Sequence, residues 1–200
     1  MRSEPVAIED PVRKLFADSF DQAAQSFSQL LMSGMVISRS NLELMDGDEY
    51  INQLEELIEE NYFTSLIKVR SYVDSCILLL IPKDKGETLH RILNGHDDTI
   101  PDSFDEEIID SIGELNNIIG LTFVNCLANT LNKSINASVP ENTFDFLGAV
   151  LESVVLQQEL ANKTIFCAEA DIKDSQNSNF GVRLVIMSEK MQFMQVLNLQ

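Results

Sequence analysis

The sequence predicts an α+β fold in which two similar halves share one sheet and one core. The chain has 200 residues, of which 44% are hydrophobic and 23% are charged, as is typical of a globular domain. Segments with helical periodicity alternate with short apolar runs that are typical of strands. The order of these segments in residues 1–98 recurs in residues 99–200. We therefore expect a single domain with an internal pseudo-twofold repeat.

In the first half the expected order is helix–strand–helix–strand–strand–helix. The second helix is indicated by apolar residues at helical spacing, namely Ile51, Leu54, Leu57 and Ile58. The expected elements are a helix at 11–31, a strand at 35–38, a helix at 48–61, strands at 65–73 and 76–81, and a helix at 86–93.

The second half is expected to repeat this order. Its elements are a helix at 104–131, a strand at 134–139, a helix within 143–160, strands at 164–172 and 182–187, and a helix at 189–197. Residues 174–181 have the composition of a hairpin turn. Residues 94–103 are polar and contain Gly and Pro, which indicates a linker between the halves.

The charge balance excludes two classes of partner. Lys and Arg number 14 against 32 acidic residues, for a net charge of -18, whereas nucleic acids and anionic membranes require a basic surface.

The N-terminus lacks the apolar core of a signal peptide, and the longest apolar run, residues 76–81, is too short to span a bilayer. We therefore expect a cytoplasmic protein.

The three cysteines and two histidines suggest no catalytic or metal site. Cys76, Cys126 and Cys167 lie far apart in apolar surroundings and are expected to be small buried hydrophobic residues. His90 and His96 have no nearby nucleophile, and the His-Asp-Asp run at 96–98 is better explained as a solvated linker than as a metal site.

The expected helix at 104–131 carries an unusual polar stripe. Its apolar face is formed by Ile108, Ile109, Ile112, Leu115, Ile118, Ile119 and Cys126. Away from that face, Asp110, Glu114, Asn117 and Leu121 follow at spacings of four, three and four, so their side chains stack on one side of the helix.

Two glycines, Gly113 and Gly120, lie beside Asn117 on this helix, although glycine costs about 1 kcal/mol relative to alanine in a helix interior. One interpretation is that they allow the surface of another protein to approach the stripe. The alternative is that the glycines ease packing within the protein and that the polar stripe is an ordinary solvated face.

Asp110, Glu114, Asn117 and Pro140 together resemble the signature of the CheC/CheX/FliY phosphatases of bacterial chemotaxis. That signature is Asp or Ser, three residues, Glu, two residues, Asn, twenty-two residues, Pro, and the spacing here is the same. The resemblance covers nearly the whole chain, because family members also consist of two related halves. Residues 112–120 look more like CheX, whereas the length also suits CheC.

The resemblance implies hydrolysis of the aspartyl phosphate of a CheY-type response regulator. Asn117 would orient the attacking water, Glu114 would pair with a lysine of the regulator, and Asp110, Gly113, Gly120 and Pro140 would support them. No cofactor of the chain's own is implied, because Mg²⁺ is expected in the regulator. A CheD-type deamidase is a further candidate partner, and whether the chain is a homodimer stays open.

The chain departs from the family pattern in two places. After the Asn, Ile119, Leu121 and Thr122 stand where small residues are usual, which predicts a bulkier rim. The equivalent motif positions in the first half are Asp10, Lys14, Ala17 and Ser40, and neither a lysine nor an alanine suits the implied chemistry. Asp10 before Pro11 instead suits a helix N-cap. We therefore expect one working site, in the second half.

Two other functions are compatible with these residues. The first is a non-catalytic adaptor that docks a response regulator or a flagellar switch component, because flagellar switch proteins resemble the same fold without the acid–amide pair. The second is a regulatory domain unconnected to chemotaxis, which would differ only in its partner. The presence of both Glu114 and Asn117 favours the enzyme.

Overall fold

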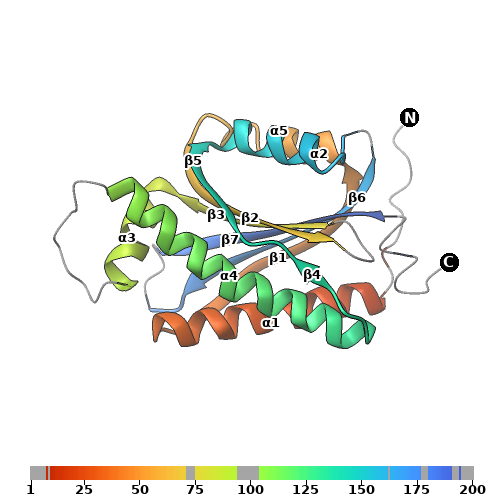
Figure 1. The fold of residues 1–200 in the computed structure, drawn as a ribbon, viewed down its shortest axis with the longest axis horizontal. Helices are drawn as coiled ribbons and strands as arrows, with labels where there is room; N and C mark the ends of the chain where they lie inside the picture. The colour runs from red at the N-terminus through yellow and green to blue at the C-terminus, as the bar shows by residue number, and fades with distance from the viewer. Residues whose placement is uncertain are drawn as a thin grey trace.

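The structure, a computed structural model, describes residues 8, 10–70, 75–93, 104–161, 163–176, 180–190 and 194. A seven-stranded sheet lies between two layers of helices (Figure 1). The strands are β1 (Met35–Asp46), β2 (Asn61–Arg70), β3 (Ser75–Pro82), β4 (Asn136–Ala137), β5 (Glu141–Phe146), β6 (Thr164–Asp174) and β7 (Gly181–Glu189). The helices are α1 (Asp10–Leu31), α2 (Gly47–Gln53), α3 (Lys83–Leu93), α4 (Phe104–Leu131) and α5 (Leu147–Gln157). The α+β class is confirmed.

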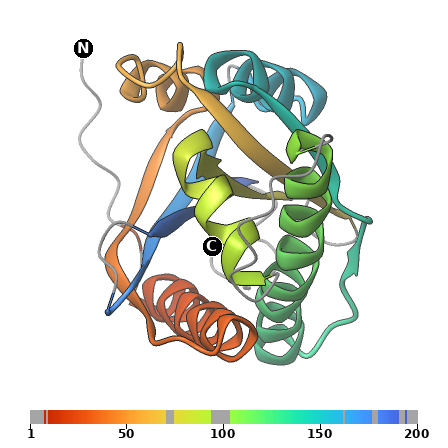
Figure 2. The ribbon, with the colours of Figure 1, turned by 90° about the vertical axis from the view of Figure 1, so that its left-hand side faces the viewer.

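Each face of the sheet carries its own hydrophobic cluster. Helices α1 and α4 pack together on one face, α2 and α5 cover the other, and α3 lies at one end (Figure 2). On the α1–α4 side the cluster includes Phe16, Phe63 and Ile112, and on the α2–α5 side it includes Tyr50 and Leu151. The apolar face predicted for α4 is therefore buried against α1 and the sheet.

Strand pairing joins the two halves of the chain. The sheet order is β1-β6-β7-β3-β2-β4, with β5 also paired to β2, and every pairing is antiparallel. Strands of each half therefore pair with strands of the other half, as β1 does with β6, and as β4 and β5 do with β2. Met32 and Asn132, which follow α1 and α4, share a φ of 50°. That the halves are a true repeat remains a prediction.

Strand β1 is longer than the sequence pattern predicted. The expected strand ended at residue 38, whereas β1 continues to Asp46 through a register shift between Ile37 and Arg39. The polar stretch Arg39–Asn41 has no strand periodicity, and it is extended because β6 hydrogen-bonds to it along its length. Only Leu42 and Met45 in the added part are buried.

Helix α2 is shorter than predicted, ending at Gln53 instead of residue 61. The chain continues as tight turns, with the amide of Leu57 bonded to the carbonyl of Leu54 at 2.7 Å and that of Glu60 to Leu57 at 3.0 Å. The run Glu55–Glu60 holds four glutamates, which the negative C-terminal end of a helix disfavours.

The strand expected at 134–139 is shorter than predicted, and a further strand follows it. Only Asn136–Ala137 form β4, and a second strand, β5, follows Pro140 within residues expected to lie next to or inside a helix. Proline has no N–H to donate to a ladder, so the edge of the sheet is interrupted there. The amide of Lys68 is satisfied instead by the side-chain oxygen of Ser138, at 3.0 Å.

The other expected elements agree with the structure to within a few residues, where they are described. Strands β6 and β7 pair as the predicted hairpin, although residues 177–179 of its turn lie outside the described residues. The linker at 94–103 and most of the helix expected at 189–197 also lie outside them. Within the described part of the chain, no helix is long and apolar enough to cross a membrane.

Candidate functional site

The predicted polar stripe lies on the solvent-facing side of α4. Asp110, Glu114, Asn117 and Leu121 are all exposed, and Leu121 is at the margin with 37% of its surface accessible. Within the described part of the chain, no hydrogen bond or ion pair involves the side chains of Asp110, Glu114 or Asn117. An acid and an amide one helical turn apart are therefore available to a partner molecule.

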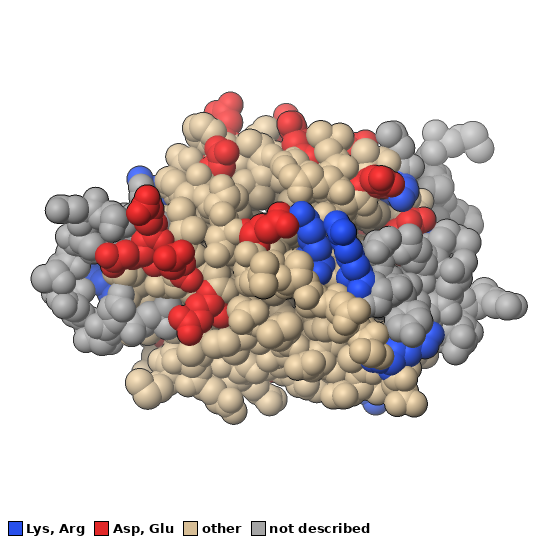
Figure 3. Space-filling view, in the orientation of Figure 1, with Lys and Arg blue, Asp and Glu red and all other residues tan. Residues whose placement is uncertain are grey.

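Acidic side chains surround the beginning of this stripe. Figure 3 shows them gathered over the N-terminal half of α4. Glu106, Glu107, Asp110 and Glu114 are all exposed there, and Glu107 lies 3.8 Å from the Nε2 atom of His90 on α3. Negative charge in the first turn of a helix is favourable, which applies to Glu106 and Glu107, whereas Asp110 and Glu114 lie beyond the first turn of α4.

The two glycines face the sheet, so the first interpretation of them is wrong. Gly113 and Gly120 are both buried. A Cβ on Gly113 would collide with the side-chain amide of Asn142 on β5, and one on Gly120 would lie 2.5 Å from Cδ1 of Ile67 on β2. Their lack of side chains lets α4 approach its own sheet closely, and they leave no space for a partner.

A polar network lies beneath the stripe, buried at Asn116 and Ser65 and exposed at Asn142, and no role was predicted for its members from the sequence. Asn116 is fully buried, and its Nδ2 donates to the carbonyl oxygen of Ser65 at 2.9 Å and to Ser65 Oγ at 3.0 Å. Ser65 Oγ in turn donates to Oδ1 of Asn142 at 2.7 Å. The feature of the sequence that could have indicated this network is the pair of adjacent asparagines. A role was predicted for Asn117 but not for Asn116.

Pro140 lies between β4 and β5, two residues before Asn142 and partly exposed. It therefore belongs to the edge of the sheet against which α4 packs, and its place in the motif spacing reflects the path of the chain from α4 to β5. This role requires no contact between Pro140 and the polar stripe.

The bulkier rim expected after Asn117 is reduced to one residue. Ile119 is fully buried in the core, and Thr122 is partly buried with its hydroxyl 3.1 Å from that of Ser26 on α1. Only Leu121 is exposed beside Asn117. The expectation for Ile119 and Thr122 was wrong because both point toward packed elements.

The corresponding positions of the first half lie on and after α1. Lys14, Ala17 and Ser40 are exposed, and Asp10 is the first residue of α1 instead of the residue before it. The exposed face of α1 therefore carries no acid–amide pair at these positions. That this half has lost a site remains a prediction.

The three cysteines are buried, as expected, and His90 is buried as well. All three thiols are free. Burial raises the pKa of Cys76 to about 12 and that of Cys167 well above its ordinary value, so both stay protonated near neutral pH. Among the described residues, no group of three or more His, Cys, Asp or Glu side chains is placed to hold a metal ion; His96–Asp98 lie outside them.

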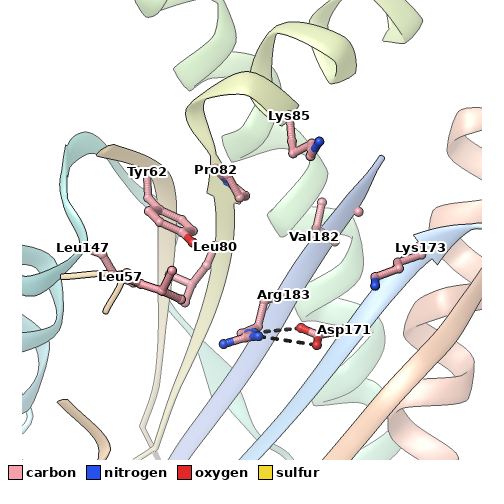
Figure 4. A pocket seen from close by; sticks show the side chains of 11 residues that line it. Leu57, Tyr62, Leu80, Pro82, Lys85, Leu147, Asp171, Lys173, Val182 and Arg183 are labelled. Carbon is pink, nitrogen blue, oxygen red and sulfur yellow. Dashed lines mark hydrogen bonds and ion pairs between the residues drawn. The ribbon is translucent and has the colours of Figure 1, made fainter. Parts of the chain in front are cut away.

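A cavity lies away from the polar stripe, on the α2–α5 side of the sheet (Figure 4). It has a volume of about 320 Å³ and is lined by Tyr62, Leu80, Lys85 and Arg183, among others. Arg183 donates to Asp171 at 2.7 Å, and Lys85 lies 2.9 Å from Asp84, so these two cations are already paired. The cavity adds nothing to the predicted site.

Comparison with known proteins finds no matching family model and no matching curated sequence. Solved structures do match. FliY from Thermotoga maritima has a TM-score of 0.72 and 10% identity, covering 96% of this chain and 97% of that chain. A chain of the CheX–CheY–BeF3–Mg²⁺ complex from Borrelia burgdorferi has a TM-score of 0.56 and 14% identity, covering 88% and 95%.

A chain of the FliM–SpeE complex from H. pylori has a TM-score of 0.62 and 11% identity, covering 96% of this chain and 95% of that chain. At these identities the likeness establishes the fold. The chain therefore has the fold of the CheC, CheX and FliY chemotaxis proteins, which the FliM structures share.

Proposed function

We propose that this chain is a phosphatase that hydrolyses the aspartyl phosphate of a CheY-type response regulator. The observation that carries the proposal is the exposed Glu114–Asn117 pair, one turn apart on a long helix whose opposite face is fixed to the sheet. The shared fold with CheX, one of whose structures is a complex with CheY, supports a regulator as the partner. We place the reaction in the cytoplasm.

The chemistry requires little from the phosphatase. Water attacks the phosphorus, the bond to the aspartyl oxygen breaks, and inorganic phosphate and a free carboxylate are formed. Phosphoryl transfer depends mainly on positioning and on electrostatic stabilisation of the transferred group. By the family resemblance, the regulator itself supplies the Mg²⁺ ion and a lysine, so this chain needs no cofactor of its own.

Asn117 suits the positioning of the water. Its carboxamide oxygen can accept a hydrogen bond from the attacking water, and its nitrogen can donate one, without a change of protonation state near neutral pH. An amide is too weak a base to remove the proton of the water, so its contribution is orientation. Because the side chain is exposed on the helix surface, it can extend into the regulator's phosphorylation site.

Glu114 suits the docking of the regulator. Its carboxylate lies one turn before Asn117 on the same side of the helix, so an ion pair with the regulator's lysine would fix where Asn117 is placed. Asp110 extends the same row by one further turn. The acids at the beginning of α4 would add attraction toward a basic partner surface.

The test is the decay of a phosphorylated response regulator from the same organism, followed as release of inorganic phosphate. Wild-type protein is expected to accelerate the decay, and Asn117→Ala is expected to reduce the acceleration at least 100-fold while still binding the regulator. Asn129→Ala is the matched control, because Asn129 is also exposed on α4 but lies more than three turns further along. Equal loss of activity in both variants would contradict the assignment.

An adaptor that binds without catalysis is the second candidate, and the match to FliM favours it. It predicts that wild-type protein binds a regulator or a flagellar switch protein but leaves the lifetime of the phosphorylated regulator unchanged. Binding of a CheD-type deamidase and self-association are separate predictions, which affinity capture with purified deamidase and light scattering would measure.

A further inference from the structure

Each site residue directly follows a residue that fixes α4 to the sheet. Gly113, whose missing side chain leaves room for the amide of Asn142, precedes Glu114. Asn116, which donates to both oxygens of Ser65, precedes Asn117. One planar peptide unit separates each exposed group from its anchor, so a rotation or shift of the helix at the anchor moves the exposed group with it.

Asn116, Ser65 and Asn142 are connected by hydrogen bonds. From Asn116 Nδ2 the chain of donors passes to Ser65 Oγ at 3.0 Å and from there to Asn142 Oδ1 at 2.7 Å. The Asn142 side chain also packs against α4 at Gly113, one turn before Asn116, without a hydrogen bond to the described residues of the helix. Residue Ser65 of β2 is thereby hydrogen-bonded to α4 at Asn116, and Asn142 of β5 contacts the preceding turn. Hydrogen bonds specify direction and register, whereas the apolar contacts around them allow sliding.

Asn116 is not what stability alone would select at this position. It is fully buried, and within the described part of the chain its Oδ1 has no hydrogen-bond partner. A buried oxygen without a partner is unfavourable, and an apolar side chain of similar size would avoid that cost. The neighbouring inward-facing residues, Leu115 and Ile119, are apolar and fully buried.

We propose that Asn116 is a positioning residue that acts through Ser65 and Asn142 to set the rotation of α4, and hence the placement of Glu114 and Asn117 on the regulator. Asn116 does not touch the substrate. The inference rests on the proposed function for its catalytic consequence, but the geometric part, that the network fixes α4 on the sheet, stands on the contacts alone.

The test compares Asn116→Leu with wild type and with Ile112→Val. Ile112 is a fully buried apolar residue one turn earlier on α4, and its shortening removes packing but no hydrogen bond. For Asn116→Leu we expect Tm to be unchanged or higher, kcat for regulator dephosphorylation to fall at least 10-fold, and KM for the regulator to stay within about twofold. Ile112→Val should lower Tm and leave kcat within twofold.

A double variant tests whether Asn116 acts through Ser65. Ser65→Ala is expected to lower kcat severalfold, and combining it with Asn116→Leu should lower kcat little further, because both changes break the same connection. A kcat for Asn116→Leu within twofold of wild type would overturn the proposal. The proposal would also be overturned if the fold-loss of kcat in the double variant equalled the product of the fold-losses in the two single variants.

A second readout is independent of enzyme activity. Nitroxide labels at Asn125→Cys on α4 and Glu152→Cys on α5, both exposed positions, report the distance between the helix layers. Asn116→Leu should shift or broaden that distance distribution, and Ile112→Val should not. An unchanged distribution overturns the positioning role even if wild-type protein proves inactive, whereas an inactive wild type with a shifted distribution contradicts only the proposed function.

Discussion

At the scale of single residues, Gly113 is where the site helix comes closest to its sheet. We expect Gly113→Ala to lower the free energy of unfolding, because the new methyl group must displace the Asn142 amide from its bond with Ser65. Overpacking of this kind costs about 1–3 kcal/mol, against about 1 kcal/mol gained from the better helix propensity of alanine. Urea unfolding followed by circular dichroism measures the balance.

The double variant Gly113→Ala/Asn142→Ala identifies the cause of that loss. Removal of the Asn142 side chain opens the space that the new methyl group needs, so the two changes should be less destabilising together than the sum of each alone. We expect a coupling of about 0.5–1 kcal/mol. Strict additivity would show that the collision is not the reason for glycine at this position.

The buried thiols predict a second residue-scale property. Burial raises the pKa of Cys76 from its ordinary 9.0 to about 12, so the folded state keeps a proton that the unfolded state loses above pH 9. This contribution is complete below about pH 9 and is lost as pH rises from there toward 12.

We therefore expect the free energy of unfolding to fall with pH in this window, by up to about 1.4 kcal/mol per unit for this thiol. Urea titrations at several alkaline pH values measure it. Cys76→Val, which cannot ionise, should show a smaller slope, and an identical slope would exclude the thiol as a cause.

At the scale of secondary-structure elements, the contact between α1 and α4 depends on aromatic packing. Phe123 of α4 is buried, with its ring centroid 5.9 Å from that of Phe16 and 6.1 Å from that of Phe20. Phe123→Ala should cost about 3–5 kcal/mol of unfolding free energy, as is typical for a buried phenylalanine. Asn125→Ala, at an exposed position on the same helix, should change it by less than about 1 kcal/mol, and a similar loss in both would contradict this packing.

Local sequence patterns were sufficient to predict the bounds of some helices but not of the edge strands. Helices α1 and α4 were predicted within one residue at each end, because both have a long apolar stripe. The second part of β1 was missed because it begins with the polar run Arg39–Asn41, and β5 was missed because it is largely exposed. Hydrogen bonds from β6 and β2 hold these two strands extended. Pairing across the sheet supplied what their own residues did not indicate.

At the scale of the whole molecule, the crossed strand pairing predicts that the two halves unfold together. Strands of each half pair with strands of the other half: β1 with β6, β4 and β5 with β2, and β3 with β7. We expect one cooperative urea transition, with the same midpoint by far-UV circular dichroism and by tyrosine fluorescence. Two separated transitions would show that the halves are independent units.

The sequence by itself determined the α+β class, the helical frame of α4 and the row of Asp110, Glu114 and Asn117 on its exposed side, because periodicity alone places such residues on one face. Only the tertiary structure decided the roles of Gly113, Gly120 and Asn116. The sequence alone does not distinguish a helix glycine or asparagine that faces a partner from one that faces the protein's own sheet. Strands distant in sequence supply Ser65, Ile67 and Asn142, and their packing turns those α4 residues inward.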